Sequence, residues 1–396
     1  MRRNPSARLA ALLLALAAGA TAQEERPALL SLDLAYTGEV FSNVSGGIHQ
    51  SSRYLDNIDL SVSLDGATAF GVEGLTLFAY ALYDNGAAVS GDLVGDAQGV
   101  SNIEADRAVR LYEAWVDQDF AVASLRAGLY DLNTEFDAIE AAGLFLNASH
   151  GIGPDFAQSG LNGPSIFPST SLGARIAVPL GSSLLRFAAL DGVPGDPRHP
   201  KRTTIRFDEG DGALLAWQVE RAFEAGPRAA LGVWRYTGRF ERVRDVVLGA
   251  PGPRLGGNTG YYAFVESPLW REGGGGQGLA GFLRVGFADA RVNVLSSYVG
   301  AGAVYTGLFP GRDDDQLGFA VATARFGEEY RRAQRSLGSP WDASEINLEL
   351  SYRFPVADWL VLQPDVQYVV NPSGDPTLEN ALAFGLRFEL AAGLRR

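Results

Sequence analysis

The sequence predicts an all-β protein: a transmembrane antiparallel β-barrel of about sixteen strands, with long loops on one side and at least one loop folded into the lumen. Three observations lead to this fold class. Many segments alternate strictly between apolar residues and small, polar or charged ones, an export signal opens the chain, and no apolar stretch of eighteen residues follows it. Strict alternation gives a strand two faces in different environments. A barrel with a lipid-facing exterior and a wet interior has such strands.

The first 22 residues have the pattern of a cleavable signal peptide. Three arginines precede a short apolar core at 9–18, and Ala20-Thr21-Ala22 forms a small-x-small cleavage site. The alternative, a single membrane helix, is disfavoured because the apolar run is too short to span a bilayer. We therefore expect a signal peptide at 1–22 and one barrel domain at 23–396.

The strands follow from the alternation. In the segment 380–390, Leu382, Phe384 and Leu386 share one face, while Gly385 and Arg387 lie on the other. The clearest segments of this kind are 58–64, 123–129, 172–178, 185–189, 279–287, 346–354, 360–368 and 380–390. Weaker candidates are 31–40, 74–84, 108–118, 212–222, 229–238, 258–266, 291–305 and 315–326. Together they make about sixteen strands, to within two, and an even number returns both chain ends to one rim.

Composition excludes several classes of function. The formal net charge is −13, and without residues 1–22, which hold three arginines, 30 basic residues would remain against 46 acidic ones, or about −16. Because nucleic-acid binding requires a positive surface, no nucleic-acid partner is expected. Cysteine is absent, so disulfides and thiolate metal sites are unavailable. No linker or shift in composition divides the chain into smaller domains.

Arginine makes up nearly all of the basic residues, and several arginines fall at particular strand positions. Lys201 is the only lysine, so 32 of the 33 basic residues are arginine. A GC-rich coding sequence would also favour arginine, and the count alone does not decide between the two explanations. Six arginines, however, fall on the polar face of a predicted strand: Arg126, Arg175, Arg186, Arg284, Arg353 and Arg387. A guanidinium facing lipid costs about 2–4 kcal/mol at the bilayer midplane, so we expect these side chains to line the lumen.

The longest segment without alternation runs from Leu132 to about Thr170 and is rich in Gly, Pro and Asn. An irregular connection of this length is unusual and is generally functional. In a barrel it can fold inward and narrow the lumen. The alternative is a loop exposed on the surface.

Several sequence runs resemble the carbohydrate-selective outer-membrane porins of the OprB family. They are 93–105, 110–115 (RLYEAW), 126–136, 144–156 (LFLNASHGIGPDF), 162–168 (NGPSIFP), 190–197, 311–315 and 362–369. The resemblance implies a sixteen-stranded barrel in the outer membrane of a Gram-negative-type bacterium, surrounded by outer-membrane lipid. It also implies passive diffusion of small neutral sugars, both mono- and oligosaccharides, past a constriction of inward loops and charged wall residues. A homo-oligomer is compatible with it. The C-terminus departs from the family pattern. Barrels of this kind usually end on an aromatic residue, whereas here residues 391–396 are expected to follow the last strand.

A sugar offers paired hydroxyls and apolar C–H faces, which arginine forks, carboxylates and aromatic rings can bind. Three sets of side chains are therefore candidates for the pore lining. They are Arg110, Glu113 and Trp115 on the strand before the long loop, Arg126, Arg175 and Arg186 on the adjoining wall, and Asn133, Glu135 and Asp137 in the loop. Two alternatives stay open. Each arginine could instead hold a loop to the wall by an ion pair, and Trp115 could belong to an outer aromatic girdle, because periodicity does not fix the inward face of 108–118.

Enzymatic activity is not expected. The three histidines, His49, His150 and His199, lie in loop-like sequence, and no nucleophile elbow, P-loop or zinc-protease helix is present. We expect no cofactor and no metal. Besides a sugar-selective channel, a general or structural porin with little substrate preference remains an alternative. A barrel-embedded lipid hydrolase using Ser149 or Ser159 with His150 is a remote one.

Overall fold

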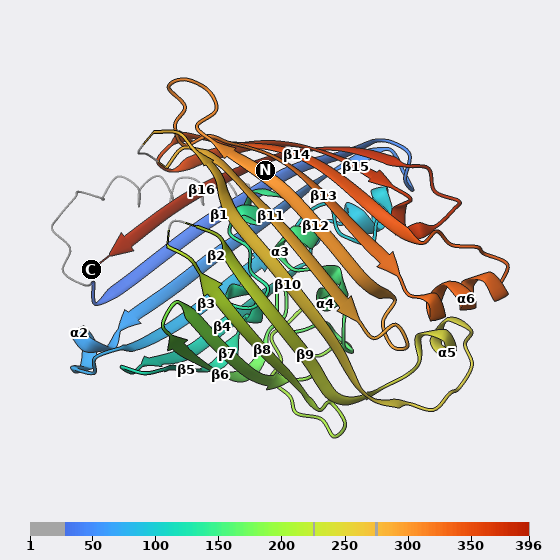
Figure 1. The fold of residues 1–396 in the computed structure, drawn as a ribbon, viewed down its shortest axis with the longest axis horizontal. Helices are drawn as coiled ribbons and strands as arrows, with labels where there is room; N and C mark the ends of the chain where they lie inside the picture. Colours follow the sequence, from blue (N-terminus) through green and yellow to red (C-terminus); the bar gives the residue numbers. More distant parts are fainter. Residues whose placement is uncertain (1–27, 225, 274–275, 396) are drawn as a thin grey trace, which may run out of the picture.

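The computed structural model describes residues 28–224, 226–273 and 276–395, and these form a closed antiparallel barrel of sixteen strands (Figure 1). Every strand pairs with its neighbours in the chain, and β1 (Leu30–Ser45) closes the barrel against β16 (Ala381–Arg395). The fold class and the strand number predicted from the sequence are confirmed. The predicted signal peptide lies outside the described residues.

The remaining strands follow in chain order. They are β2 (Ser51–Asp65), β3 (Leu75–Asp84), β4 (Ala108–Asp119), β5 (Ser124–Tyr130), β6 (Ser171–Leu180), β7 (Ser183–Asp191), β8 (Ala213–Ala222), β9 (Arg228–Phe240), β10 (Leu255–Arg271), β11 (Gly278–Ala288), β12 (Leu295–Thr306), β13 (Gln316–Phe326), β14 (Ser344–Ala357) and β15 (Leu360–Val370). The helices are short: α2 (Gly66–Phe70), η1 (Ser90–Val94), η2 (Leu132–Thr134), η3 (Ala141–Leu144), α3 (Ala148–Gly151), α4 (Pro154–Ala157), α5 (Val243–Val247), α6 (Glu328–Ser336) and η4 (Pro372–Gly374). None of the helices in the described ranges is long and apolar enough to cross a membrane.

The two faces of the strands differ as the alternation predicts. On β16, Phe384 and Leu386 are about half exposed on the outside, while Ala383 and Arg387 are buried inside. An apolar outer face of this kind is typical of barrels that span a membrane. The last strand extends beyond its predicted end. Residues 391–395 continue β16, paired with 31–35 of β1, because β1 supplies a long edge for them.

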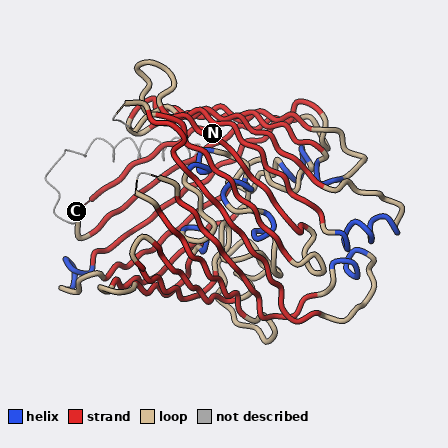
Figure 2. Tube along the Cα trace, viewed as in Figure 1, coloured by secondary structure: helices blue, strands red, loops and turns tan. Residues whose placement is uncertain are grey.

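The two ends of the barrel are unlike. Helices α5 and α6 mark the end with the longer connections, and α2 and the C-terminus mark the opposite end (Figure 1). We call these the loop side and the turn side. The connection between β5 and β6, residues 131–170, is named the inserted loop here, and it carries η2, η3, α3 and α4. Loops and short helices fill much of the space enclosed by the strands (Figure 2).

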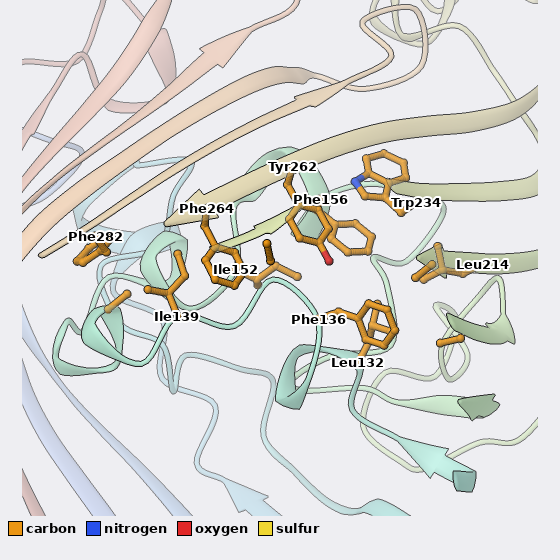
Figure 3. Packing of buried hydrophobic residues seen from close by; sticks show 14 of the residues in the cluster. Leu132, Phe136, Ile139, Ile152, Phe156, Leu214, Trp234, Tyr262, Phe264 and Phe282 are labelled. Carbon is orange, nitrogen blue, oxygen red and sulfur yellow. The ribbon is translucent and has the colours of Figure 1, made fainter. Parts of the chain in front are cut away.

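The inserted loop packs against the inner wall through apolar side chains. Leu132, Phe136 and Phe156 are fully buried and belong to one cluster with wall residues such as Trp234 and Phe264. Figure 3 shows these side chains pointing toward one another from the loop and from the strands. Phe156 stacks on Trp234 with ring centroids 5.0 Å apart and planes 4° from parallel. The loop therefore lies inside the barrel and narrows it.

Candidate functional site

A buried ion-pair cluster fastens the inserted loop to the wall. Arg284 on β11 bonds to Asp137, with Nη2 and Oδ2 2.6 Å apart, and also to Asp155. All three side chains are buried. Gly153 lies directly against Arg284, and a Cβ at this position would come within 1.8 Å of Nη1. The glycine is therefore required for the guanidinium to reach both carboxylates.

Wall carboxylates and amides also bind the backbone of the inserted loop. Glu349 on β14 accepts hydrogen bonds from the N–H groups of Leu146 and Asn147. Glu266 on β10 accepts from Ala141 N–H at 2.9 Å. Buried backbone groups must be paired, and these wall side chains pair them where the loop has no sheet partner. The loop conformation is thus specified by the wall.

The connection between β3 and β4, residues 85–107, enters the lumen in the same way. Glu345 on β14 accepts from the N–H groups of Ala97 and Gln98 at 2.7 and 3.1 Å. Burial raises the pKa of the neighbouring Asp96 to about 6. Ser101 donates to Glu39, which also pairs with Arg387. Two loops therefore share the interior.

Four of the nine candidate residues meet on the wall next to the inserted loop. Arg126 and Arg175 both bond to Asp117, at 2.8 and 2.7 Å. Arg175 also bonds to Glu135 at 2.8 Å, and Arg186 pairs with Glu220 at 2.8 Å. Although burial opposes ionisation, Arg126 and Arg175 hold the pKa of Glu135 below its ordinary value. Glu135 is therefore a charged acceptor.

These pairs continue along the wall to β10. Arg228 bonds to Glu220 at 3.2 Å and to Glu266 at 2.7 Å. The result is a row of four arginines and four carboxylates, which we call the lumenal charge row: Arg126, Arg175, Arg186, Arg228, Asp117, Glu135, Glu220 and Glu266. Its formal charges cancel. The side chains are between 3% and 20% exposed, so most keep some surface open to the lumen.

The charge row borders a chamber on the turn side of the inserted loop. Arg228 and Glu266 line this cavity of about 820 Å³ together with loop residues 140–144. Arg353 and Glu389 line it from elsewhere on the wall and pair with each other at 3.1 Å. Two ion pairs of opposite charge therefore line the chamber.

Trp115 faces the lumen and not the lipid. Its indole N–H donates to Glu113, and its ring lies between Phe78, with centroids 4.8 Å apart, and the Arg126 guanidinium, 3.8 Å from the ring centroid. Both ring faces are covered, so Trp115 positions Arg126. A β-bulge explains its direction: the pairing of β3 with β4 shifts between Tyr80 and Ala81, and residue 112 is skipped. A bulge changes the phase of a strand, so Arg110 and Trp115, five residues apart, both point inward.

The other candidates hold loops in place. Arg110 is buried, pairs with Asp84 at 2.9 Å, and donates to the carbonyl of Pro200. Glu113 accepts from Asp131 N–H at 2.9 Å, and Asn133 donates to the Gly151 carbonyl at 3.1 Å. These contacts match the ion-pair alternative considered for the arginines. Five further charged residues belong to these contacts and were not predicted from the sequence: Asp117, Glu220, Arg228, Glu266 and Asp155. For the four wall residues, charge within or beside a predicted strand was the available signal, whereas Asp155 lies in the middle of the long segment 132–170.

Within the described part of the chain, no group of three or more His, Asp or Glu side chains could hold a metal ion.

Comparisons with known proteins agree with the geometry. The family model described as "Carbohydrate-selective porin, OprB family" matches residues 49–391. Porin B of Pseudomonas aeruginosa is 23% identical over 404 residues, covering 90% of this chain and 86% of that protein. The high-pH structure of Pseudomonas putida OprB has a TM-score of 0.80 at 19% identity, covering 98% of this chain and 97% of that one. The outer membrane channel DcaP of Acinetobacter baumannii has a TM-score of 0.56 at 10% identity, covering 91% and 96%.

At their low sequence identity, the two solved structures show only that the fold is shared. The family model matches most of the chain and therefore shows the family. It follows that this chain is not an enzyme but a channel of the Gram-negative outer membrane, and that it belongs to the OprB family of carbohydrate-selective porins.

Proposed function

We propose that mono- and oligosaccharides cross this barrel by passive diffusion along the lumenal charge row, with the inserted loop setting the width of the path. The observation that carries this proposal is the row itself, in which donors and acceptors alternate and their charges cancel. A neutral sugar can exchange its bound water for these fixed groups. Guanidinium forks and carboxylates suit the paired hydroxyls of a sugar.

The nine candidate residues then divide into three roles. Arg126, Arg175, Arg186 and Glu135 contact the sugar, and Trp115 positions Arg126. The other four, which are Arg110, Glu113, Asn133 and Asp137, set the positions of the loops. Conduction requires weak binding, so we expect millimolar affinity, about −4 kcal/mol.

The apolar outer face supports contact with outer-membrane lipid around the barrel. Export with cleavage after Ala22 would deliver the chain to this membrane, and N-terminal sequencing of the mature protein tests that step. A homo-oligomer would bury part of the same outer face, and crosslinking in native membranes tests for it.

Liposome swelling separates a sugar-selective channel from a general porin. We expect glucose to enter faster than an amino acid or an anion of similar size. Arg126→Gln and Glu135→Gln should each slow glucose entry, because each removes one partner of the charge row. Arg291→Gln, which breaks an exposed loop pair with Asp289, is the matched control and should have no effect. Equal entry of all three solutes would favour the general porin.

A further inference from the structure

A second cavity opens on the loop side of the barrel, away from the charge row. It has a volume of about 340 Å³ and is lined by Asp106, Arg110 and Pro200 on one side and by residues 162–164 and 166–169 of the inserted loop on the other. We name it the mouth pocket. Arg110 is the third residue of β4, and Asp117 of the charge row lies seven residues further along the same strand. At about 3.4 Å per residue, the two places are roughly 20 Å apart.

We propose that the mouth pocket is a capture subsite for one neutral hexose ring, occupied before the sugar reaches the charge row. This inference rests on the proposed function, because it assumes that sugars are the solutes that pass. It adds a separate binding site with its own residues and its own specificity.

The apolar part of the pocket suits the C–H face of a pyranose ring. Phe167 and three prolines, Pro164, Pro168 and Pro200, contribute to the lining. Tyr112 contacts Phe167 with ring centroids 6.4 Å apart and planes at 65°, so an edge-to-face contact from the wall supports the phenyl ring. Ligand pockets commonly combine such apolar lining with a few placed polar groups.

The polar part of the pocket consists of a buried arginine and two accessible acceptors. The Nη atoms of Arg110 bond to Asp84 and to the carbonyls of Asp106 and Pro200, while its buried Nε–H has no hydrogen-bond partner in the described ranges. Asn162 uses its Nδ2 on the Pro194 carbonyl, which leaves its side-chain oxygen to accept. The carboxylate of the exposed Asp106 also accepts. Because that Nε–H is buried, the groups open to a sugar hydroxyl are the side-chain oxygens of Asn162 and Asp106.

Size and charge define the specificity. The pocket is less than half the volume of the turn-side chamber, so it suits one ring, and a longer saccharide would extend beyond it. Among the residues that line the pocket, Asp106 and Arg110 are the charged ones, and Arg110 is already paired with Asp84, so the carboxylate of Asp106 is the unpaired charge of this lining. Like charges repel, so neutral hexoses should bind better than hexuronates.

The test uses full-length protein in planar bilayers, with glucose or glucuronate added on the loop side and current block measured. Phe167→Ala should weaken glucose block roughly fivefold, the effect of one lost aromatic contact, while leaving the sugar-free conductance unchanged. Asp106→Asn changes an exposed side chain and should fold normally. It should allow glucuronate to block as glucose does. Phe287→Ala, on the outer face, is the control and should match the parent.

The outcomes distinguish this inference from the proposed function. If both Phe167→Ala and Asp106→Asn show the parent's block by both sugars, the mouth pocket is not a capture subsite, even if Arg126→Gln still slows glucose entry. If Phe167→Ala alone fails to fold, Asp106→Asn decides. If glucose never blocks the parent and enters liposomes no faster than an amino acid, the proposed function fails, and this inference fails with it.

Discussion

Removing Arg284 should release the inserted loop without opening the barrel. In Arg284→Met, Asp137 and Asp155 remain buried without a cation, and losing one partner of a buried ion pair costs about 3–5 kcal/mol. At 1.4 kcal/mol per factor of ten, this shifts the balance between the seated and displaced loop by about 150- to 4,000-fold. The strand pairs of β11 with β10 and β12 use backbone groups and persist.

Single-channel recording in planar bilayers measures this effect. We expect larger and noisier conductance and weaker discrimination by sugar size, with heat-modifiable gel mobility retained as evidence of a folded barrel. Arg291→Met is the control, because its pair with Asp289 lies in an exposed loop and should contribute under about 1 kcal/mol. The triple variant Asp137→Asn, Asp155→Asn, Arg284→Met removes the uncompensated charges. Its conductance and current noise should therefore return part of the way to those of the parent. A folded Arg284→Met channel with the parent's conductance and size discrimination would refute this reasoning.

Three further predictions concern the loops and the ion path. Deleting residues 140–158 should raise conductance and reduce size discrimination in the same bilayer assay, because this part of the inserted loop packs inside the barrel. Despite the acidic sequence, reversal potentials should show weak ion selectivity, since the charge row is neutral and salt screens distant charges beyond about 8–10 Å; a large cation preference would contradict this. The raised pKa of Asp96 means that the seated loop 85–107 binds a proton more tightly than the displaced loop. Lowering the pH from about 7 to 4 should therefore reduce the noise of the channel current. The current through Asp96→Asn should show low noise at both pH values.

The sequence determined the barrel because alternation is a local property. Lipid on one side and water or loop on the other impose a period of two on every strand, and the segment 380–390 shows this without reference to any other part of the chain. Membership of the OprB family was also readable from contiguous runs such as 144–156. The inward direction of Arg126, Arg175 and Arg186 followed from the cost of placing a guanidinium in lipid.

The tertiary structure alone decided which inward charges meet. Arg284 is 147 residues from Asp137 and 129 from Asp155, and these partners are brought together by the path of the inserted loop. The direction of Trp115 also could not be predicted from alternation, although the residues that decide it lie on adjacent strands. A single bulge near Tyr80 reverses the phase of β4, and no alternation rule predicts where a strand will add one residue. Period-two patterning specifies a face within a strand, but ion pairing and bulges depend on the neighbouring strand and on the loop that lies against it.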